Sequence, residues 1–307
     1  MKADTGVKSI LGKAMVAYSE GAFELAAELC DSGLSHSKQH PELLHLRGLL
    51  YFEKGEIHNA THAVREAIAH EPNQAHFSNS LGVMLKASGQ ISEAIDAYKA
   101  ALSRKPNYAE ALNNLGDAYA HNEQLDLAES QFRRALAFNR SYSDAHYNLG
   151  NLLKRMGRLQ EAVSQFDLCL DIEDSHSGAH WNRSLALLSL GRYEEAWPGY
   201  EWRFQQPEFP AARELPIPMW KGEPLGGKRL FVYTEQGFGD TLQFLRFVRP
   251  LLVQADQVLL ECPSRLIALL ETFDEKLVLV PKESELPEVD YYLPMMSLPE
   301  RIELSRE

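Results

Sequence analysis

The sequence predicts a mainly α-helical protein in which about six helical hairpins are followed by a small α/β segment. Two observations lead to this prediction. Small residues recur with a fixed spacing over roughly the first two thirds of the 307-residue chain. After Gln206 this periodicity ends, and short apolar runs alternate with stretches of helical spacing. A long repeat indicates stacked supersecondary units, whereas the alternation indicates a parallel sheet.

The repeat consists of four series of residues that share a period of 34 residues. One series is small and comprises Gly48, Gly82, Gly116, Gly150 and Ser184. A second comprises Gly21, Gly55, Gly89, Gly157 and Gly191, with Glu123 as its exception. A third comprises Ala26, Ala60, Ala94, Ala128, Ala162 and Ala196. The fourth is aromatic in its later members, Tyr98, Phe132, Phe166 and Tyr200.

Each series has a physical interpretation. Apolar residues such as Ala145, Leu149 and Leu152 share one face of a helix. The small residue at position 150 allows this helix to approach its neighbour closely. A glycine of the second series ends that helix in the left-handed backbone region. A second helix with its own apolar face follows. We therefore expect helix–turn–helix units over residues 7 to 206.

This pattern resembles the tetratricopeptide repeat (TPR) family, with another helical solenoid as the alternative. The resemblance implies a superhelix over residues 1–206, with a concave groove lined by the first helix of each hairpin. Such a groove implies a protein or an extended peptide as the partner. Oligomerisation is left open by the sequence.

Asparagines recur on the predicted groove helices, at Asn79, Asn114, Asn148, Asn151 and Asn182. A carboxamide offers two N–H donors and one carbonyl acceptor, so a row of them can bind the backbone of an extended peptide. The row looks like the asparagine ladder of the eukaryotic O-linked N-acetylglucosamine transferases. The alternative is that these side chains only solvate the groove or bond to neighbouring turns.

Composition excludes several classes of function. The formal net charge of −12, without a block of Lys and Arg, argues against a nucleic-acid partner. Three distant cysteines without C-x-x-C spacing argue against a disulfide framework or zinc site and favour a reducing, cytoplasmic location. The N-terminus has no apolar run long enough for a signal peptide or membrane span.

Histidines offer three i,i+4 pairs, a spacing that suits zinc: His36/His40, His58/His62 and His176/His180. None has the glutamate of an H-E-x-x-H motif or an evident third ligand in the sequence. We therefore expect solvent-facing imidazoles and no metal site.

The sequence pattern changes in the C-terminal segment. Residues 207–228 are rich in Pro and Gly and are interpreted as a linker. Strands are expected at 229–234, 257–262, 277–280 and 291–293, with helices at 240–252 and 264–272 between them. Strands that alternate with helices predict a Rossmann-like α/β lobe over residues 229–307.

The loop after the first of these strands carries Glu235, Gln236, Gly237, Gly239 and Asp240. Its glycines allow a tight turn and the close approach of a ligand. Leu242 occupies the third glycine position of a dinucleotide fingerprint, so no cofactor is expected in this chain. On local sequence alone, Asp240 is better explained as the N-cap of the following helix than as a functional residue.

The motifs WKGEPLGGKRL and TEQGFGDTLQF resemble the start of the glycosyltransferase region in bacterial TPR-linked glycosyltransferases and, more loosely, the heptosyltransferases. The resemblance implies the acceptor-side lobe of a GT-B enzyme. Gly239 and Asp240 match the family's Gly-Asp pair, whose aspartate acts as the general base in an inverting transfer. Glu235 and Gln236 would then line the acceptor pocket beside the loop glycines Gly237 and Gly239. The alternative, which we favour for these two side chains, is that they are ordinary polar loop residues.

About 75 residues follow the first strand, which is too few for the donor lobe of such an enzyme. A nucleotide sugar is therefore expected only if a second lobe completes the site. We favour a peptide-binding scaffold joined to an acceptor-side lobe that is not catalytic alone. The alternatives are a protein O-glycosyltransferase completed by a partner or by further sequence, and a plain adaptor whose α/β lobe serves as a cap.

Overall fold

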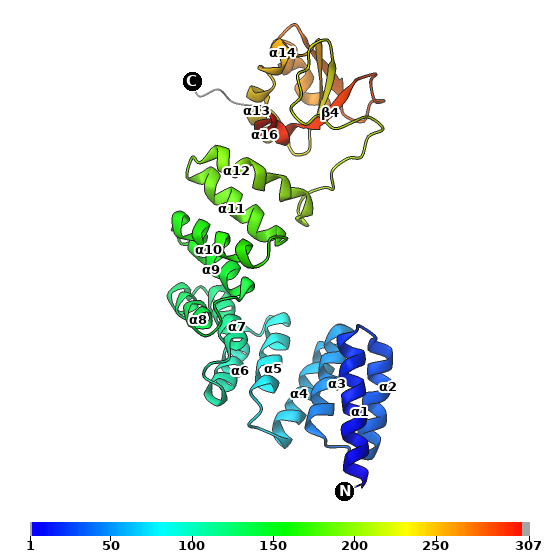
Figure 1. The fold of residues 1–307 in the computed structure, drawn as a ribbon, viewed down its shortest axis with the longest axis vertical. Coiled ribbons are helices and arrows are strands. Elements are labelled where there is room, and N and C mark those ends of the chain that lie inside the picture. The colour runs from blue at the N-terminus through cyan, green and yellow to red at the C-terminus, as the bar shows by residue number, and fades with distance from the viewer. Residues whose placement is uncertain (1, 303–307) are drawn as a thin grey trace. The chain divides into compact units, whose positions relative to one another are not determined.

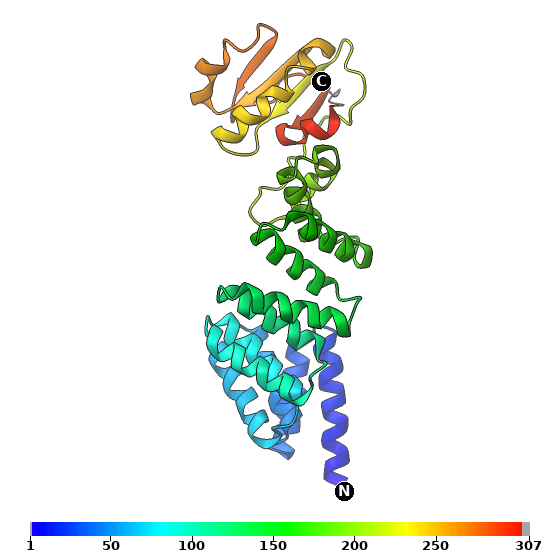
Figure 2. The same cartoon turned by 90° about the vertical axis from the view of Figure 1, so that its left-hand side faces the viewer.

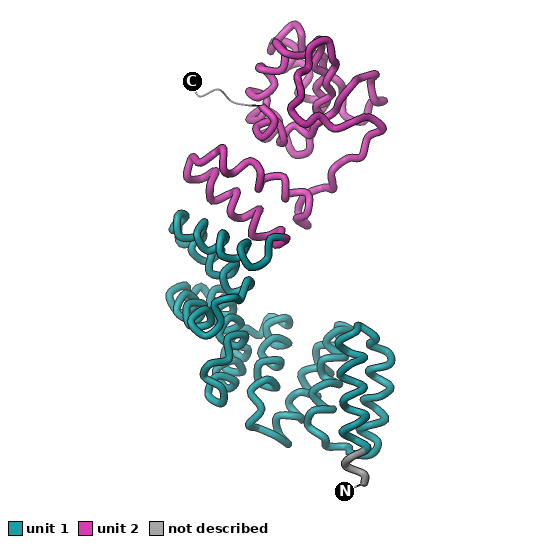
Figure 3. The backbone as a smooth tube through the Cα atoms, in the orientation of Figure 1, with its two compact units in different colours: residues 1–174 teal, residues 175–307 magenta. Residues whose placement is uncertain are grey.

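The computed structural model describes residues 2–302 and has the predicted mainly helical architecture (Figure 1). The chain forms two compact units, Met1–Asp174 and Ser175–Glu307 (Figure 3). Each unit has its own internal packing and is described in turn. The predicted end of the repeat array at residue 206 therefore lies inside the second unit.

The first unit is a stack of antiparallel helical hairpins, in which each helix packs on the next one along the chain (Figures 1 and 2). Within the described residues its helices are α1 (Lys2–Ser19), α2 (Phe23–His36), α3 (Pro41–Glu53), α4 (Ile57–His70), α5 (Ala75–Ala87), α6 (Ile91–Arg104), α7 (Ala109–His121), α8 (Leu125–Phe138), α9 (Ser143–Arg155) and α10 (Leu159–Ile172).

The close helix crossings occur where the small residues of the repeat predict them. A Cβ added to Gly116 would lie 2.8 Å from the ring of Phe132, and one added to Gly150 would lie 2.6 Å from the ring of Phe166. These separations are too short for real carbon atoms. Each glycine therefore fits against the large side chain in the second helix of the same hairpin.

The second glycine series ends the first helices, as predicted. Gly55, Gly89 and Gly157 have φ of 77°, 79° and 76°. Glu123, the exception in sequence, takes the same left-handed conformation with φ of 58°. The repeat geometry thus overrides the preference of a side chain for negative φ.

The second unit begins with one further hairpin, α11 (Ser177–Ser189) and α12 (Tyr193–Tyr200), continued by a 3₁₀ turn η1 (Glu201–Gln205). Four strands follow, β1 (Arg229–Tyr233), β2 (Gln257–Cys262), β3 (Leu277–Pro281) and β4 (Tyr291–Pro294). Short helical segments connect or follow them: α13 (Phe238–Phe244), η2 (Leu245–Phe247), α14 (Leu251–Gln254), η3 (Ser264–Leu266), α15 (Ile267–Leu270), η4 (Met295–Ser297) and α16 (Leu298–Arg301).

The strands form one parallel sheet in the order β3-β2-β1-β4. Leu230 in β1 is in register with Val258 in β2 and with Tyr291 in β4. All four strands lie within a residue of the predicted ranges, because each is a short and mainly apolar run.

The two predicted helices are shorter than expected. Residues 240–252 are divided among α13, η2 and α14, and the break precedes Leu251 at Pro250. Proline has no backbone N–H and disfavours helical geometry in the residue before it, which interrupts the helix here. Residues 264–272 form only η3 and α15.

The Pro- and Gly-rich segment 207–228 does more than connect two parts of the unit. Trp220 donates its backbone N–H to Tyr292 O at 2.9 Å, so the segment pairs with the outer edge of β4. Leu215, Ile217 and Met219 pack against Phe231 and its neighbours on one face of the sheet. Proline is compatible with such an edge position, because the backbone N–H that it lacks is not needed on the side that faces away from the sheet.

The other face of the sheet shares one hydrophobic core with the last hairpin. Leu230 and Val232 in β1 belong to the same cluster as Tyr200 in α12. The Trp197 ring centroid lies 6.3 Å from that of Phe244 and 6.2 Å from that of Phe247. The α/β lobe therefore covers an apolar face of this hairpin, which in a solenoid must be covered or polar.

Candidate functional site

The asparagines predicted to bind a peptide lie on the first helices of successive hairpins. Asn79 is on α5, Asn114 on α7, and Asn148 and Asn151 on α9. Asn182 is half-buried on α11, in the second unit. The first four positions are thus carried by neighbouring helices of one unit.

Some of these amides bond to one another across the hairpin junctions. Asn114 Nδ2 donates to Asn79 Oδ1 at 3.1 Å, and Asn148 Nδ2 donates to Asn113 Oδ1 at 3.1 Å. In both pairs the residues are 35 positions apart, so the same contact recurs at successive junctions. The amides therefore form a ladder inside the protein that ties one first helix to the next.

Asn79 is the most deeply placed of the predicted residues. It is 2% exposed, and its Nδ2 donates to Glu110 Oε1 at 2.8 Å. Its carbonyl accepts the bond from Asn114. Its side chain thus faces the neighbouring repeat, whereas Asn114, Asn148 and Asn151 are only half-buried.

A pocket of about 180 Å³ lies between α7 and α9. Its lining combines amides with charges of both signs and two rings, through Asp117, His121, Phe132, Asn148, Asn151 and Arg155. Among the residues that the structure describes, the Asn151 carboxamide makes no hydrogen bond. The pocket can therefore accept and donate hydrogen bonds at once, which suits a peptide group.

The charged residues of this pocket are held by contacts with one another and with a neighbouring hairpin. Asp117 pairs with Lys86, and its Oδ1 lies 3.6 Å from His121 Nε2. Arg155 Nη1 donates to the backbone carbonyl of Ala120 at 2.9 Å. These contacts join three hairpins, so the pocket depends on the stacking of the array.

The predicted loop site follows β1. Gly237 is the N-cap of α13, with extended φ of −75° and ψ of −174°, and Asp240 lies in the first turn of the helix. The alternative interpretation of Asp240 as the N-cap is therefore wrong, because the helix begins earlier than its sequence spacing indicated. A Cβ added to Gly237 or Gly239 meets nothing within 4 Å, so space above the loop is open.

Glu235 has a different role from a pocket-lining residue. Its side chain is 2% exposed, and its Oε1 accepts from Arg203 Nε at 3.0 Å. The backbone N–H of Met296 donates to Oε2 at 3.0 Å. Burial raises the pKa of the Glu235 carboxyl, while Arg203 acts in the opposite direction. Gln236, the next residue, is half-buried.

Arg203 is the centre of this network and was missed by sequence reasoning. It is fully buried, and its guanidinium also donates to Glu201 Oε1 at 2.6 Å and to Ser297 Oγ at 2.8 Å. It therefore connects three segments: η1, η4 and the loop that follows β1. Glu235 and Ser297 are distant from Arg203 in the sequence, so the local sequence does not show that it connects these segments.

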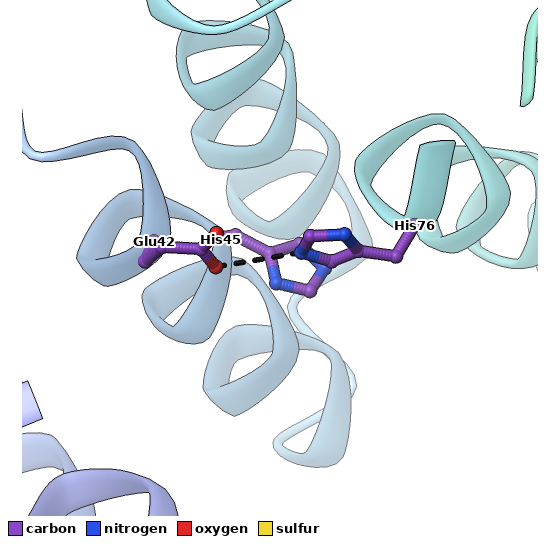
Figure 4. A group of neighbouring side chains, drawn as sticks. All are labelled: Glu42, His45 and His76. Carbon is purple, nitrogen blue, oxygen red and sulfur yellow. Dashed lines mark hydrogen bonds and ion pairs between the residues drawn. The ribbon is translucent and has the colours of Figure 1, made fainter. Parts of the chain in front are cut away.

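A second feature missed by sequence reasoning is a cluster of Glu42, His45 and His76 (Figure 4). His76 Nε2 lies 3.4 Å from Glu42 Oε2, and the His45 and His76 ring centroids are 5.1 Å apart. Burial, and then the neighbouring His76, lower the pKa of His45 to about 3, so its imidazole is neutral at pH 7. The i,i+4 spacing of histidines does not reveal this cluster, because its residues lie on two helices and meet across a junction.

Comparison with known families identifies the repeats. Residues 82–123 and 116–157 match a family described as TPR repeat. Residues 143–176 match one described as Tetratricopeptide repeat. The chain therefore contains TPR repeats and has the architecture of a TPR-type scaffold.

Solved structures show the same fold. PilF of Pseudomonas aeruginosa has a TM-score of 0.61 at 16% identity, over 67% of this chain and 93% of its own. PilW, described as a widely conserved type IV pilus biogenesis factor, has a TM-score of 0.60 at 20% identity, over 65% and 92%. A thermophilic TPR protein of Thermus thermophilus, TTC0263, has a TM-score of 0.51 at 24% identity, over 59% and 99%.

No protein of curated function matches the chain. The resemblance of the C-terminal segment to glycosyltransferases finds no support in these comparisons. Among the helices of residues 2–302, none combines the length and the apolar character that a bilayer span requires.

Proposed function

We propose that the repeat array is a protein-interaction scaffold that holds an extended polypeptide along α5, α7 and α9. The pocket between α7 and α9 carries this proposal, because Asn148 and Asn151 meet there beside charges of both signs. A partner bound through its backbone would be accepted with little regard to its side chains.

The internal ladder supports this function by fixing the amides in advance. The bond from Asn148 to Asn113 uses one N–H and leaves a second N–H and the carbonyl for a ligand. Asn114 is held by Asn79 in the same way, one repeat earlier. A side chain fixed before binding loses less rotamer freedom when the ligand arrives. Asn79 thus connects α5 to α7 instead of contacting the ligand. Asn182 is the later member of the asparagine series in the sequence and lies on α11.

Peptide binding can be tested with a phage-displayed library of random 12-residue peptides selected on the full chain. We expect Asn148→Ala with Asn151→Ala to weaken the selected peptides by about 5- to 150-fold, the equivalent of two lost hydrogen bonds. Asn59→Ala is the matched control, because Asn59 is exposed on the second helix α4.

Circular dichroism would establish that the double variant keeps its helices. Equal peptide affinity of the double variant and the control, measured by fluorescence anisotropy, would contradict peptide binding through these asparagines. Failure to select any peptide would do so as well.

A second candidate function concerns the α/β lobe. We infer a Rossmann-like, acceptor-side half of a glycosyltransferase, with Asp240 as the general base. The strand order supports it: β1 neighbours both β2 and β4, and this reversal is where open parallel sheets bind ligands. The open loop of Gly237, Gly239 and Asp240 follows β1 at that point. Buried Glu235 then positions the loop instead of contacting an acceptor.

Calorimetry with a panel of UDP- and GDP-sugars tests the lobe. We expect no binding tighter than about 1 mM to the 307-residue chain, since the lobe would require a donor half from elsewhere. Tight binding would contradict the inference of an incomplete site. If sugar transfer is also absent after a donor lobe is added to the assay, the α/β lobe of this chain serves only as a cap and the chain is an adaptor.

We also infer a cytoplasmic location. Cys30, Cys169 and Cys262 are buried and unpaired, which suits a reducing compartment. Fractionation of cells that express the tagged full chain tests this inference, and recovery from an oxidising compartment would contradict it.

A further inference from the structure

The junction between the second and third hairpins of the array brings together three side chains of types that bind metals. Glu42 and His45 lie on α3, and His76 lies on α5, the first helix of the next hairpin (Figure 4). One ligand atom from each lies within 4.8 Å of the others. Two imidazoles and one carboxylate are a ligand set that zinc accepts, with a fourth position left for water.

One of the distances already matches a zinc site, and all three lie within 4.8 Å. Bonds of about 2.0–2.1 Å to zinc place tetrahedral ligand atoms about 3.4 Å apart. His76 Nε2 and Glu42 Oε2 are already separated by 3.4 Å. Their side chains are 41% and 32% exposed, so both can rotate toward an ion and solvent can reach the open position.

The third ligand is held from the opposite helix. His45 is 8% exposed, and its Nε2 lies 2.9 Å from Ser80 Oγ on α5. A metal-binding imidazole is commonly oriented by a hydrogen bond of this kind. The ring is therefore fixed toward α5 before an ion arrives.

The next junction provides a comparison within the same chain. One repeat later, the positions of Glu42, His45 and His76 are occupied by His76, Asn79 and Glu110. There Asn79 donates to Glu110 at 2.8 Å and accepts from Asn114, so the side chains at these positions connect the helices through hydrogen bonds. The junction between α3 and α5 has an imidazole where the junction between α5 and α7 has an amide, and this difference creates the ligand set.

We propose that Glu42, His45 and His76 bind a divalent transition metal of the zinc class, which ties α3 to α5. Imidazole ligands favour zinc, copper or nickel over magnesium and calcium, which prefer oxygen. The bound ion would replace the hydrogen-bonded tie of the next junction and stabilise the N-terminal hairpins.

Calorimetric titration of the EDTA-treated full chain with zinc tests whether the site binds a metal. We expect one ion per chain and a higher midpoint of thermal unfolding with zinc. His45→Asn should weaken binding at least tenfold. This variant should fold, because Asn79 makes the equivalent contact at the next junction.

The control variant carries His58→Gln and His62→Gln, which removes an exposed i,i+4 pair on α4. It should bind zinc as tightly as the unaltered chain. Zinc binding that survives His45→Asn, or that is lost in the His58/His62 variant, would overturn the proposal. So would the absence of stoichiometric zinc binding by the unaltered chain.

Discussion

At the scale of single residues, burial decides how the cysteines behave. Cys30 is inaccessible, and its Sγ donates to Leu43 O at 3.2 Å. Burial raises the pKa of Cys30 to about 11 and that of Cys169 to about 12. The thiolate is the reactive form, so both side chains are inert packing residues in the folded chain.

Alkaline pH should therefore destabilise the fold through these thiols. In the unfolded chain they ionise near the usual pKa of 9.0, whereas in the fold they stay protonated up to about 11. The contribution of the protonated thiols to the free energy of unfolding is fully present below pH 9 and is lost as the pH rises through the pKa of the folded state. Each thiol should lower the free energy of unfolding by at most about 1.4 kcal/mol per pH unit.

Urea unfolding between pH 8 and 10.5 measures this slope. Cys169→Ala should make it shallower, whatever the variant does to stability at pH 8. An unchanged slope would show that Cys169 ionises alike in the folded and unfolded chain.

Glu123 offers a test of backbone strain. It holds φ of 58° where equivalent positions have glycine, and it pairs with Arg155 on the surface. Glu123→Gly should stabilise the chain by about 1 kcal/mol, because the left-handed region disfavours a side chain and an exposed ion pair contributes little. Gly157→Ala should destabilise it by a similar amount. A shift of the urea midpoint in the opposite direction for either variant would contradict this account.

At the scale of elements, each hairpin depends on pairing a glycine with a large side chain. Gly150→Ala would place a Cβ 2.6 Å from the Phe166 ring, so we expect a loss of about 1–3 kcal/mol in the free energy of unfolding. Adding Phe166→Leu should recover part of the loss, and a double-mutant cycle measures that coupling.

The control for this packing is Gly12→Ala in α1, where an added Cβ meets nothing within 4 Å. It should be neutral or stabilising, since alanine favours helices over glycine. If Gly150→Ala behaves like Gly12→Ala, the close crossing is not what the repeat glycine provides.

The elements could be predicted from sequence where a pattern is local or periodic. Glycine spacing marked both the crossings and the helix ends, and short apolar runs marked the strands. The pairing of residues 218–220 with β4 was hidden, because an edge position needs no continuous apolar run. The sites were harder still. Asparagine periodicity pointed to the first helices, but only the structure shows that Asn79 bonds to Glu110.

At the scale of the whole molecule, the chain has two compact units with different sources of order. Local contacts between neighbouring hairpins dominate the first unit, as expected of a solenoid. The second unit relies on contacts between residues far apart in sequence, since Arg203 meets Ser297, 94 positions away. A change at Arg203 should therefore act on the second unit alone.

Arg203→Met tests this division. Removing the guanidinium leaves the buried Glu235 carboxylate without its partner, which we expect to cost about 3–5 kcal/mol in the stability of the second unit. Amide hydrogen exchange of the full chain should become faster in α12, β1 and β4 and stay unchanged in α3–α8. Arg192→Met, which breaks an exposed ion pair with Glu195, should leave both units unchanged.

Adding Glu235→Met to Arg203→Met should restore much of the protection, because it removes the uncompensated charge. Faster exchange in α3–α8 would mean instead that the two units unfold together. In that case the α/β lobe would stabilise the whole array, and removal of its buried ion pair would weaken peptide binding at the pocket of Asn148 and Asn151.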